Sequence, residues 1–309
     1  MSLDAILKQY KKNASNASSK KMTNEERLKQ YFTTYLPDSL QSKTKRVRIL
    51  PVGENQTPFI EVKGHKSQVN GQWRTFICPK HEKDEDCPFC EAREALLSTG
   101  ESGDKELAKK YYPRLMYVVK VIDRDHEDEG VKFWRFNHDF RKTGIYDKIM
   151  GVVQAIQGSA APDFTDVENG RDLIISINRD QNKRPTVSSI VQGDPSPLHT
   201  NKDLVEEWLA DDRTWEDVYS VKPYSYLEII VKGGEPTWKR NESGDGGEWV
   251  DKNALSDESN DDGEELTVGG ENSTQTEKSE DSTEAKTEKV GAEASGSDAS
   301  DEDEDDLPF

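Results

Sequence analysis

The sequence predicts a mainly β fold with short helices, built on a small closed or partly closed barrel. Short segments rich in β-branched and aromatic residues recur between residues 41 and 250, whereas apolar residues at helical spacing are confined to a few stretches. The strands do not alternate regularly with helices, as they do in a parallel sheet of βαβ units. These observations favour a barrel over an α/β sheet.

Residues 1–40 are expected to form a helical N-terminal arm. Apolar residues recur at helical spacing between positions 3 and 10, and Thr23 and Glu26 have the spacing of a capping box that opens a second short helix. The buried face of this second helix is expected to comprise Leu28, Tyr31, Phe32 and Tyr35. The arm either packs on the core or docks on the next protomer along a lattice, and the sequence leaves both interpretations open.

Residues 41–250 are expected to form the core of the protein. Strands are predicted at 46–51, 59–62, 115–122, 131–136, 173–177 and 186–191. Helices are predicted after Cys90 up to Gly100, at 145–156 and at 204–209, and residues 224–231 are expected to close the core. Most of the chain's apolar residues therefore lie in short, separate elements.

All three cysteines lie within thirteen positions, and the last two are spaced C-x-x-C, as Cys87 and Cys90. A disulfide would leave one sulfur unpaired, and clustered Cys and His in a reducing compartment indicate bound Zn²⁺. Two histidines compete for the fourth ligand position, because His81 gives a compact spacing with Cys78 and His65 lies further away. The sequence therefore predicts one zinc ion, held by three cysteines and one histidine.

The dipeptide Asn70-Gly71 favours His65 as the fourth ligand. It is the strongest short signal for a β-hairpin with a type I′ turn, which would place His65 opposite Phe76 and Lys63 opposite Cys78. His65 and Cys78 then become diagonal neighbours across the ladder. We favour His65 on this basis, with His81 as the alternative.

A shell of three thiolates and one imidazole is full, so this zinc is expected to be structural. A zinc deaminase needs H-x-E upstream of P-C-x-x-C, but Lys66 and Ser67 follow His65 and Asp86 precedes Cys87. The sequence contains neither phosphate-binding loop, G-x-x-x-x-G-K-[ST] or G-x-G-x-x-G, and no nucleophile elbow. We therefore expect a protein that is not an enzyme.

The net charge of −19 is concentrated at the C-terminus. Residues 251–309 contain 4 Lys and 21 Asp or Glu, a net charge of −17, which leaves −2 for residues 1–250. This segment has almost nothing apolar to bury, so a disordered acidic tail is predicted. No apolar run is long enough to span a membrane and no secretory signal opens the chain, so a protein without membrane contact in a reducing cytoplasm is expected.

Basic and aromatic residues are interleaved on the predicted strands, as single-stranded nucleic acid binding requires. Cations follow the phosphates, and exposed aromatic faces stack on unpaired bases. These runs contain the candidate DNA contacts Arg46, Arg48, Lys110, Tyr111, Tyr112, Arg114, Lys132, Trp134 and Arg135, several of which are singled out only by the family resemblance described next. Alternate residues of a strand point into the core, so about half of the aromatic residues are expected to be interior packing.

Several of these segments resemble one known family. The segments are Arg48-Ile49-Leu50-Pro51, His65, Asn70-Gly71-Gln72-Trp73, Cys78, Cys87-Pro88-Phe89-Cys90, Lys132-Phe133-Trp134-Arg135-Phe136 and Tyr146-Asp147-Lys148-Ile149. Together they are similar to the single-stranded DNA-binding (helix-destabilising) proteins of T4-like bacteriophages, over about residues 45–156.

The resemblance implies an OB-fold core with a zinc-bearing subdomain at about residues 60–100. It also implies cooperative, sequence-independent coating of single-stranded DNA, self-association along it, and a role in DNA replication, recombination and repair in the cytoplasm of a bacterial host. It assigns the metal to His65, Cys78, Cys87 and Cys90. The chain departs from the family at Lys183 and Arg184, where aromatic residues were expected, which indicates phosphate contact in place of stacking.

The last residues of the tail form a second candidate site. Acidic residues lead to an apolar tip, Asp305-Asp306-Leu307-Pro308-Phe309. This tip is similar to the C-terminal peptide of bacterial single-stranded DNA-binding proteins and implies docking of replication and recombination proteins. The acidic tail is also expected to compete with DNA for the cationic groove. The alternative function is a zinc-ribbon transcription or assembly factor acting mainly through protein contacts.

Overall fold

The computed structural model describes residues 23–53, 56–159, 163–241 and 246–254 of the 309-residue chain. The predictions for the first part of the arm and for the acidic tail lie outside these residues. Strands dominate the described part, and the prediction of a mainly β fold with short helices is confirmed. Within these residues, no helix is both long and apolar enough to cross a membrane.

Eight strands form one mixed sheet. They are β1 (Tyr31–Phe32), β2 (Ser42–Ile49), β3 (Ile60–Val69), β4 (Gln72–Ile77), β5 (Arg114–Asp123), β6 (Val131–Asn137), β7 (Arg171–Arg179) and β8 (Pro185–Pro195). The hydrogen-bonded order is β1-β6-β5-β2-β7-β8, and β3 and β4 branch from β5. A separate hairpin consists of β9 (Pro236–Arg240) and β10 (Gly247–Asp251).

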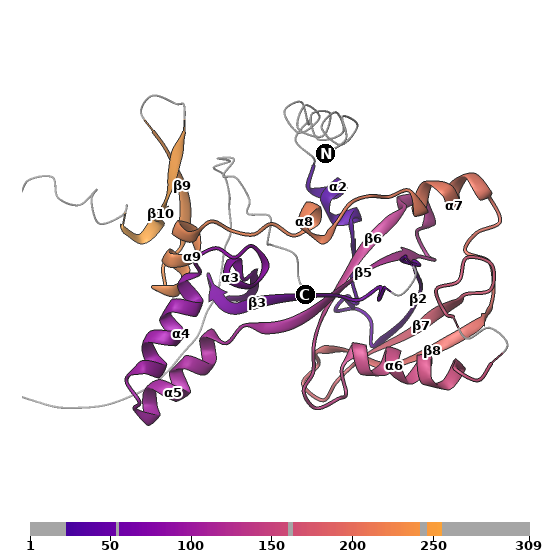
Figure 1. Ribbon diagram of the computed structural model, residues 1–309, viewed down its shortest axis with the longest axis horizontal. Helices are drawn as coiled ribbons and strands as arrows, with labels where there is room; N and C mark the ends of the chain where they lie inside the picture. Colours follow the sequence, from indigo (N-terminus) through magenta and orange to yellow (C-terminus); the bar gives the residue numbers. More distant parts are fainter. Residues whose placement is uncertain (1–22, 54–55, 160–162, 242–245, 255–309) are drawn as a thin grey trace, which may run out of the picture.

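Strand β5 is the central strand of the sheet. Along one of its edges, the first half pairs with one strand and the second half pairs with another. β6 pairs along nearly the whole of its other edge. On the divided edge, Ile60–Gly64 of β3 pair with Arg114–Val118, and Val47–Ile49 of β2 pair with Val121–Asp123. β5 thus joins two ends of the molecule, which Figure 1 shows to the left and right of its label.

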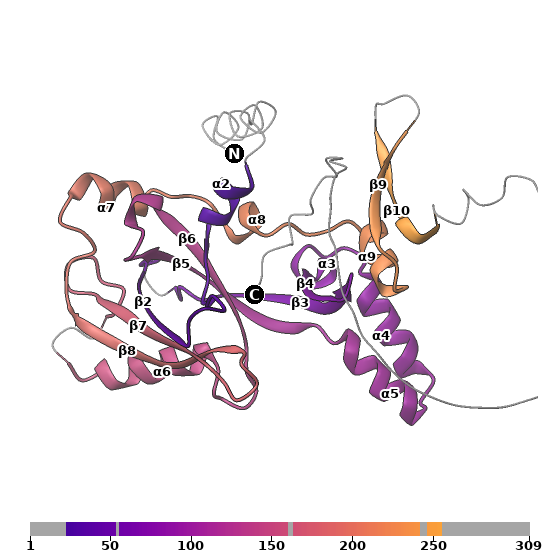
Figure 2. The same cartoon turned by 180° about the vertical axis from the view of Figure 1, so that it is seen from behind.

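The right-hand end in Figure 1 contains β2, β7, β8 and two of the helices, α6 (Ile145–Ile156) and α7 (Lys202–Leu209). The principal core gathers apolar side chains from six strands and α6, among them Val47, Val119, Trp134, Ile149 and Ile190. The sheet must curl for strands β6 and β8 to share one core. Figure 2 shows α6 lying along β7 and β8.

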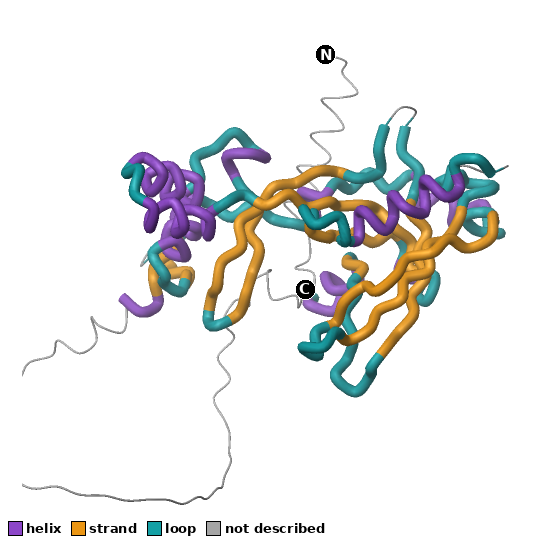
Figure 3. Tube along the Cα trace, turned by 90° about the horizontal axis from the view of Figure 1, so that it is seen from below, coloured by secondary structure: helices purple, strands orange, loops and turns teal. Residues whose placement is uncertain are grey.

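The left-hand end in Figure 1 contains the β9–β10 hairpin and most of the remaining helices. These are α3 (Pro79–Glu82), α4 (Pro88–Ser98), α5 (Ser102–Ala108), the 3-10 turn η1 (Lys109–Tyr111) and α9 (Tyr224–Val231). Seen from below in Figure 3, helices gather at this end and strands predominate at the other. The prediction that residues 224–231 close the barrel core is wrong, because they form α9, which packs beside the cysteines.

The segment between β8 and α9, residues 196–223, runs along one side of the molecule and connects its two ends (Figure 1). We call it the strap, and it contains α7 and α8 (Trp215–Val218). Lys120 donates to the carbonyl of Asp211 at 2.7 Å, and Arg213 donates to the carbonyl of Val131 at 2.7 Å. Trp215 of the strap packs on the face of β5 opposite the principal core, so β5 is buried on both faces.

The start of the second predicted helix is confirmed. α2 (Asn24–Lys29) begins with a reciprocal capping box, in which the Glu26 amide donates to Thr23 Oγ1 at 3.2 Å and Glu26 accepts from the Thr23 amide at 2.8 Å. The expected extent is wrong, because Tyr31 and Phe32 form β1 and pair in parallel with β6. Both side chains are buried in the sheet, whereas Leu28 and Tyr35 are exposed.

Candidate metal centre and nucleic-acid interface

The β3–β4 hairpin has the predicted turn and register. Asn70 and Gly71 have φ values of 51° and 78°, as both central residues of a type I′ turn require. His65 lies opposite Phe76, and the Cys78 amide donates to the carbonyl of Lys63 at 2.9 Å. The hairpin therefore brings His65 on β3 close to Cys78, the residue that precedes α3.

Four buried side chains converge beside this hairpin: His65, Cys78, Cys87 and Cys90. Cys87 precedes α4 and Cys90 lies in its first turn, so the start of this helix brings the C-x-x-C pair together. Pro88 occupies the first helical position, where proline is favoured. The candidate ligand atoms of the four residues all lie within 4.8 Å of one another. The alternative ligand His81 is exposed in α3 and does not belong to the cluster.

The separations between these atoms fit a tetrahedral zinc site. His65 Nε2 lies 3.4 Å from Cys87 Sγ and 3.6 Å from Cys90 Sγ, and the sulfurs of Cys78 and Cys90 are 3.6 Å apart. Zinc–sulfur and zinc–nitrogen bonds of ordinary length place tetrahedral ligands roughly 3.5–3.8 Å from one another. The cluster thus has the donor set and the spacing for one zinc ion.

The imidazole of His65 is fixed in one tautomer. Its Nδ1 lies 2.9 Å from the carbonyl oxygen of Tyr111 and must carry the proton, since a carbonyl can only accept. The lone pair of Nε2 therefore points toward the sulfurs. The ring also stacks on Phe89 with centroids 4.8 Å apart and an interplanar angle of 9°. The hydrogen bond thus selects the tautomer that leaves Nε2 available as a metal ligand.

Without a cation, the three thiols compete for protons. The hydrogen bond with Cys87 raises the pKa of Cys78 to about 11, whereas hydrogen bonds with Cys78 and Cys90 lower the pKa of Cys87. Contact with the other two sulfurs also raises the pKa of Cys90. A divalent cation relieves this competition, because a coordinated thiol is deprotonated.

Aromatic and apolar side chains enclose the ligands. Phe76 of β4 and Phe89 of α4 stack at 6.2 Å, and Tyr226 of α9 lies against Phe76. Trp249 of β10 meets the Tyr226 ring edge-on at 4.8 Å. The site is thus a small core of its own, which ties a hairpin, two helices and the β9–β10 hairpin together.

The predicted DNA contacts divide into surface and interior residues. Six are exposed: Arg46, Lys110, Tyr112, Arg114, Lys183 and Arg184. Tyr111 and Arg135 are partly buried; the guanidinium of Arg135 lies 4.9 Å from the ring centroid of Tyr219. These eight remain candidates for contact with DNA.

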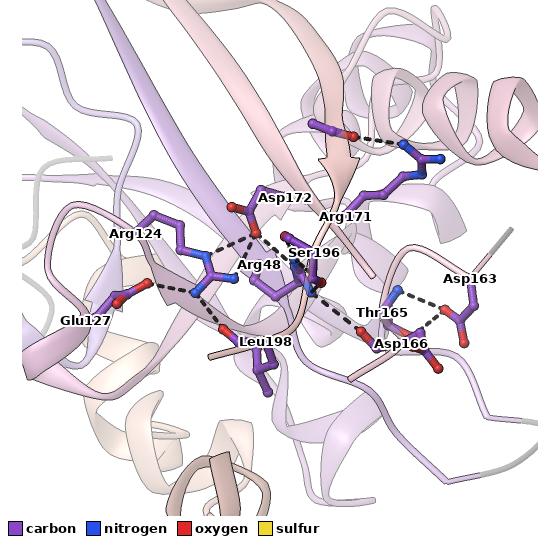
Figure 4. Close-up of polar contacts among 11 residues, drawn as sticks. Arg48, Arg124, Glu127, Asp163, Thr165, Asp166, Arg171, Asp172, Ser196 and Leu198 are labelled. Atoms are coloured by element: carbon purple, nitrogen blue, oxygen red, sulfur yellow. Dashed lines mark hydrogen bonds and ion pairs between the residues drawn. The ribbon is translucent and has the colours of Figure 1, made fainter. Parts of the chain in front are cut away.

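The expectation that Arg48 contacts DNA is corrected, because its side chain is fully buried. It donates to Asp172 Oδ1 at 2.9 Å, to Ser196 Oγ at 2.8 Å and to the Ser196 carbonyl (Figure 4). Arg124 donates to the same oxygen of Asp172 from the other side. Arg48 therefore fastens the start of the strap to β2 and β7.

The same correction applies to Lys132 and Trp134. Lys132 is 4% exposed and pairs with Glu129 at 2.6 Å, and Trp134 is 1% exposed in the principal core. The edge of the Trp134 ring packs on Phe32 at 5.3 Å, which is possible because β1 adds to the edge of β6. Neither side chain is free to contact a phosphate or a base in this structure.

Three cations from separate elements lie close enough to interact. The pKa of Lys66 on β3 is lowered by partial burial and then by the charges of Arg114 on β5 and Arg184 at the β7–β8 turn. No ion pair is found for these three side chains within the described residues. We call Lys66, Arg114 and Arg184 the basic cluster; the positive charges of the two arginines each act on Lys66.

Two exposed aromatic residues were missed by the sequence reasoning. Trp73 on β4 is 64% exposed, and Lys66 Nζ lies 5.3 Å from its ring centroid. Phe140, in the loop after β6, is 73% exposed. The register of the hairpin could have indicated Trp73, because it places Trp73 opposite the exposed Gln68, but no periodic signal marks Phe140.

A comparison with known protein families identifies the family of this chain. A family model described as gp32 DNA binding protein like matches residues 42–226, well over half of the chain. The chain belongs to this family. The comparison with curated proteins gives no match.

Membership of the gp32-like family confirms two predictions made from the residues. Its members bind single-stranded DNA, and they are not enzymes. The match begins at β2 and ends within α9, so it includes the curled sheet except β1, the candidate metal ligands and the strap. The β9–β10 hairpin of this gp32-like protein lies beyond it.

Proposed function

We propose that this protein coats single-stranded DNA cooperatively and without sequence preference, and that it recruits replication, recombination and repair proteins to the coated strand. Family membership establishes the binding of single-stranded DNA. The proposal concerns the residues that carry out the binding, the role of the metal, and the assembly of protein on the strand.

The basic cluster carries the proposal. Lys66, Arg114 and Arg184 come from three separate elements, yet Lys66 lies close enough to both arginines for their charges to act on it. Such an arrangement costs free energy in the free protein and is relieved by a polyanion. A strand of phosphates supplies the missing negative charges and releases its own counterions.

Aromatic residues beside the cations supply the second half of the interaction. Trp73 exposes its ring next to Lys66, and Tyr112 exposes its ring next to Arg93, whose guanidinium lies 5.3 Å from the ring centroid. Stacking of a base on such a ring is worth about 1–3 kcal/mol and tolerates any base. The interface therefore favours unpaired bases and reads little sequence.

We assign one structural Zn²⁺ to His65, Cys78, Cys87 and Cys90. The four donors fill a tetrahedral shell, so the ion stabilises the fold and takes no part in chemistry. The hairpin that carries Lys66 and Trp73 contributes His65, and the carbonyl of Tyr111 holds that histidine. The metal thus supports the surface that meets DNA.

The remaining predictions are part of the same proposal. We assign an OB-fold-type barrel to residues 41–250, with its zinc subdomain at about 60–100; the curled sheet around one core supports this. Residues 1–40 are proposed to contact the next protomer on the strand. The tip Asp305-Asp306-Leu307-Pro308-Phe309 is proposed to dock partner proteins in the cytoplasm of a bacterial host.

Titration against poly-dT and duplex DNA over a range of salt concentrations tests the proposal. The wild-type chain should prefer the single strand, bind it cooperatively, and weaken as salt rises. Replacing Lys66, Arg114 and Arg184 by Ala should reduce the slope of log K against log[salt] by about 2, since each phosphate contact on a single strand contributes roughly 0.7.

Lys232→Ala is a matched control, because Lys232 pairs with Glu228 on the surface of α9; this variant should keep the wild-type slope. Equal affinity for both DNA forms would instead support the zinc-ribbon assembly factor. A triple variant with an unchanged slope would show that phosphates are bound elsewhere.

A further inference from the structure

The loop between β6 and α6, residues 138–143, exposes an aromatic ring that the proposed interface has not used. Phe140 is 73% exposed, the largest fraction among the large apolar side chains of the described residues. An exposed phenyl ring loses the free energy that burial would give it, on the order of 1.5–3 kcal/mol. Contact with a ligand or a partner would bury the ring and recover this free energy.

The loop is held in one conformation by Asp139. Its carboxylate accepts from the Arg141 amide at 2.9 Å and from the Thr143 hydroxyl at 2.6 Å, and its carbonyl accepts from the Lys142 amide at 3.0 Å. A Cβ at Gly144 would lie 2.8 Å from the Cβ of Asp139, so only glycine fits there. Phe140 is therefore presented by a pre-organised turn, which lowers the entropy cost of binding.

The loop begins beside the basic cluster. The His138 amide donates to the carbonyl of Leu115 at 2.9 Å, and Leu115 directly follows Arg114. The His138 ring meets Phe140 edge-on at 5.0 Å and lies 3.3 Å from the Tyr117 hydroxyl. The loop thus starts beside the residue that follows Arg114 on β5, and the His138 ring links Phe140 to Tyr117.

Two further cations directly follow Phe140 in the sequence. Arg141 and Lys142 are both exposed, and neither has an ion pair within the described part of the chain. Asp139 is already occupied by hydrogen bonds inside the loop, which lower its pKa. An exposed aromatic ring next to exposed cations matches the chemistry of single-stranded DNA, with bases and phosphates in alternation. A purely apolar partner would leave Lys142 without a counterpart.

We propose that Phe140 stacks on a base of single-stranded DNA, while Arg141 and Lys142 contact the adjacent phosphates. The loop extends the path of the strand away from the basic cluster. This inference rests on the proposed function and adds a stacking residue to it.

The test is a titration of the full-length protein with a dT oligonucleotide at several salt concentrations. Phe140→Ala should weaken binding about 5- to 150-fold without changing the salt slope, because stacking releases no counterions. Phe140→Tyr should bind within about twofold of the wild type, since a phenol ring also stacks. Changing Arg141 and Lys142 together to Ala should reduce the salt slope by about 1.4.

Leu209→Ala is the control for removal of an exposed apolar side chain, since Leu209 is 44% exposed at the end of α7; it should leave binding unchanged. Thermal melting of each variant checks that folding is intact. If the wild type binds and Phe140→Ala binds equally well, the stacking role of Phe140 is overturned, but the proposed role of the basic cluster in DNA binding is not affected. If the wild type itself fails to prefer dT over duplex, the proposed function fails as well.

Discussion

His65 donates a hydrogen bond from Nδ1 to the carbonyl oxygen of Tyr111, with the two atoms 2.9 Å apart. Tyr111 lies in η1, between Lys110 and Tyr112, so a candidate metal ligand is bonded to the backbone of a candidate DNA-binding segment. A structural metal contributes folding free energy to the elements that its ligands join. Here its neighbourhood includes the start of β5 and the turn that precedes Arg114.

Replacing the two candidate histidines separately tests the ligand assignment. His65→Ala should release zinc, because it removes the nitrogen that lies 3.4 Å from Cys87 Sγ. His81→Ala should retain one zinc per chain, since His81 is exposed and lies outside the cluster. Metal analysis of both purified variants gives the answer; loss of zinc only from the His81 variant would reverse the assignment.

Chelation of the proposed zinc ion should destabilise the part of the protein around its four ligands and weaken DNA binding. A ligand present at 100 times its dissociation constant stabilises the folded state by about 2.7 kcal/mol. For a chain of this size, such a loss lowers the melting temperature by roughly 5–11 °C. Melting and dT titration before and after treatment with a chelator, with zinc added back as control, measure both effects. Apoprotein that melts and binds like the zinc form would refute this role.

The metal centre was more predictable from the sequence than the DNA interface. The ligands lie in a hairpin and a short helix, where Asn70-Gly71 and the C-x-x-C spacing fix the local geometry. The burial of Trp134 depends on β1, which arrives from about a hundred residues earlier in the chain and covers the edge of β6. Alternation along a strand shows which residues share a face, but it does not show what covers that face.

The strap accounts for a second feature that could not be predicted from the sequence, the burial of Arg48 and of both faces of β5. β5 is apolar on both sides because Trp215 of the strap lies on one face and the principal core lies on the other. Arg48 holds the start of the strap, and its sequence context was that of a surface cation among other cations. No local pattern distinguishes an arginine that pairs with Asp172 from one that pairs with phosphate.

At Gly64, strand β3 lies between β4 and β5. A side chain at this position should destabilise the β3–β4 hairpin, which carries His65. A Cβ would lie 2.8 Å from both the Met116 methyl carbon and the Phe76 carbonyl oxygen. Gly64→Ala should therefore cost about 1–3 kcal/mol of folding free energy. Gly103→Ala in α5 is the matched control, since nothing lies within 4 Å of its Cβ position, and it should stabilise by about 0.4–1 kcal/mol. Denaturant unfolding of both variants tests the contrast, and equal stabilities would contradict it.

Breaking the Arg48–Asp172 pair should affect stability rather than DNA contact. Arg48 is fully buried, so Arg48→Ala leaves the Asp172 carboxylate and the Ser196 groups with fewer partners, at a cost of about 3–5 kcal/mol. The salt slope of DNA binding should remain that of the wild type, measured at a temperature where the variant is folded. Arg46→Ala is the comparison, because Arg46 is exposed on the same strand. A folded Arg48 variant with a reduced slope would place Arg48 on the DNA after all.

Removing residues 255–309 should tighten binding to single-stranded DNA, most of all at low salt. With Asp251 and Lys252 retained, the deletion removes 20 of the acidic residues and 3 lysines, a net charge of −17, while the basic cluster keeps its uncompensated cations. If the tail competes with phosphates for these cations, its loss raises the affinity. Salt weakens both interactions, because at 0.1 M it largely screens exposed charges that are more than about 10 Å apart.

A neutral tail of the same length, with Asp and Glu changed to Asn and Gln, separates charge from length. It should behave like the deletion, because the competition depends on charge. Equal affinities for the wild type, the deletion and the neutral tail at every salt concentration would show that the acidic segment does not occupy the cationic surface. The tail's remaining role would then be the docking of partners through Leu307, Pro308 and Phe309.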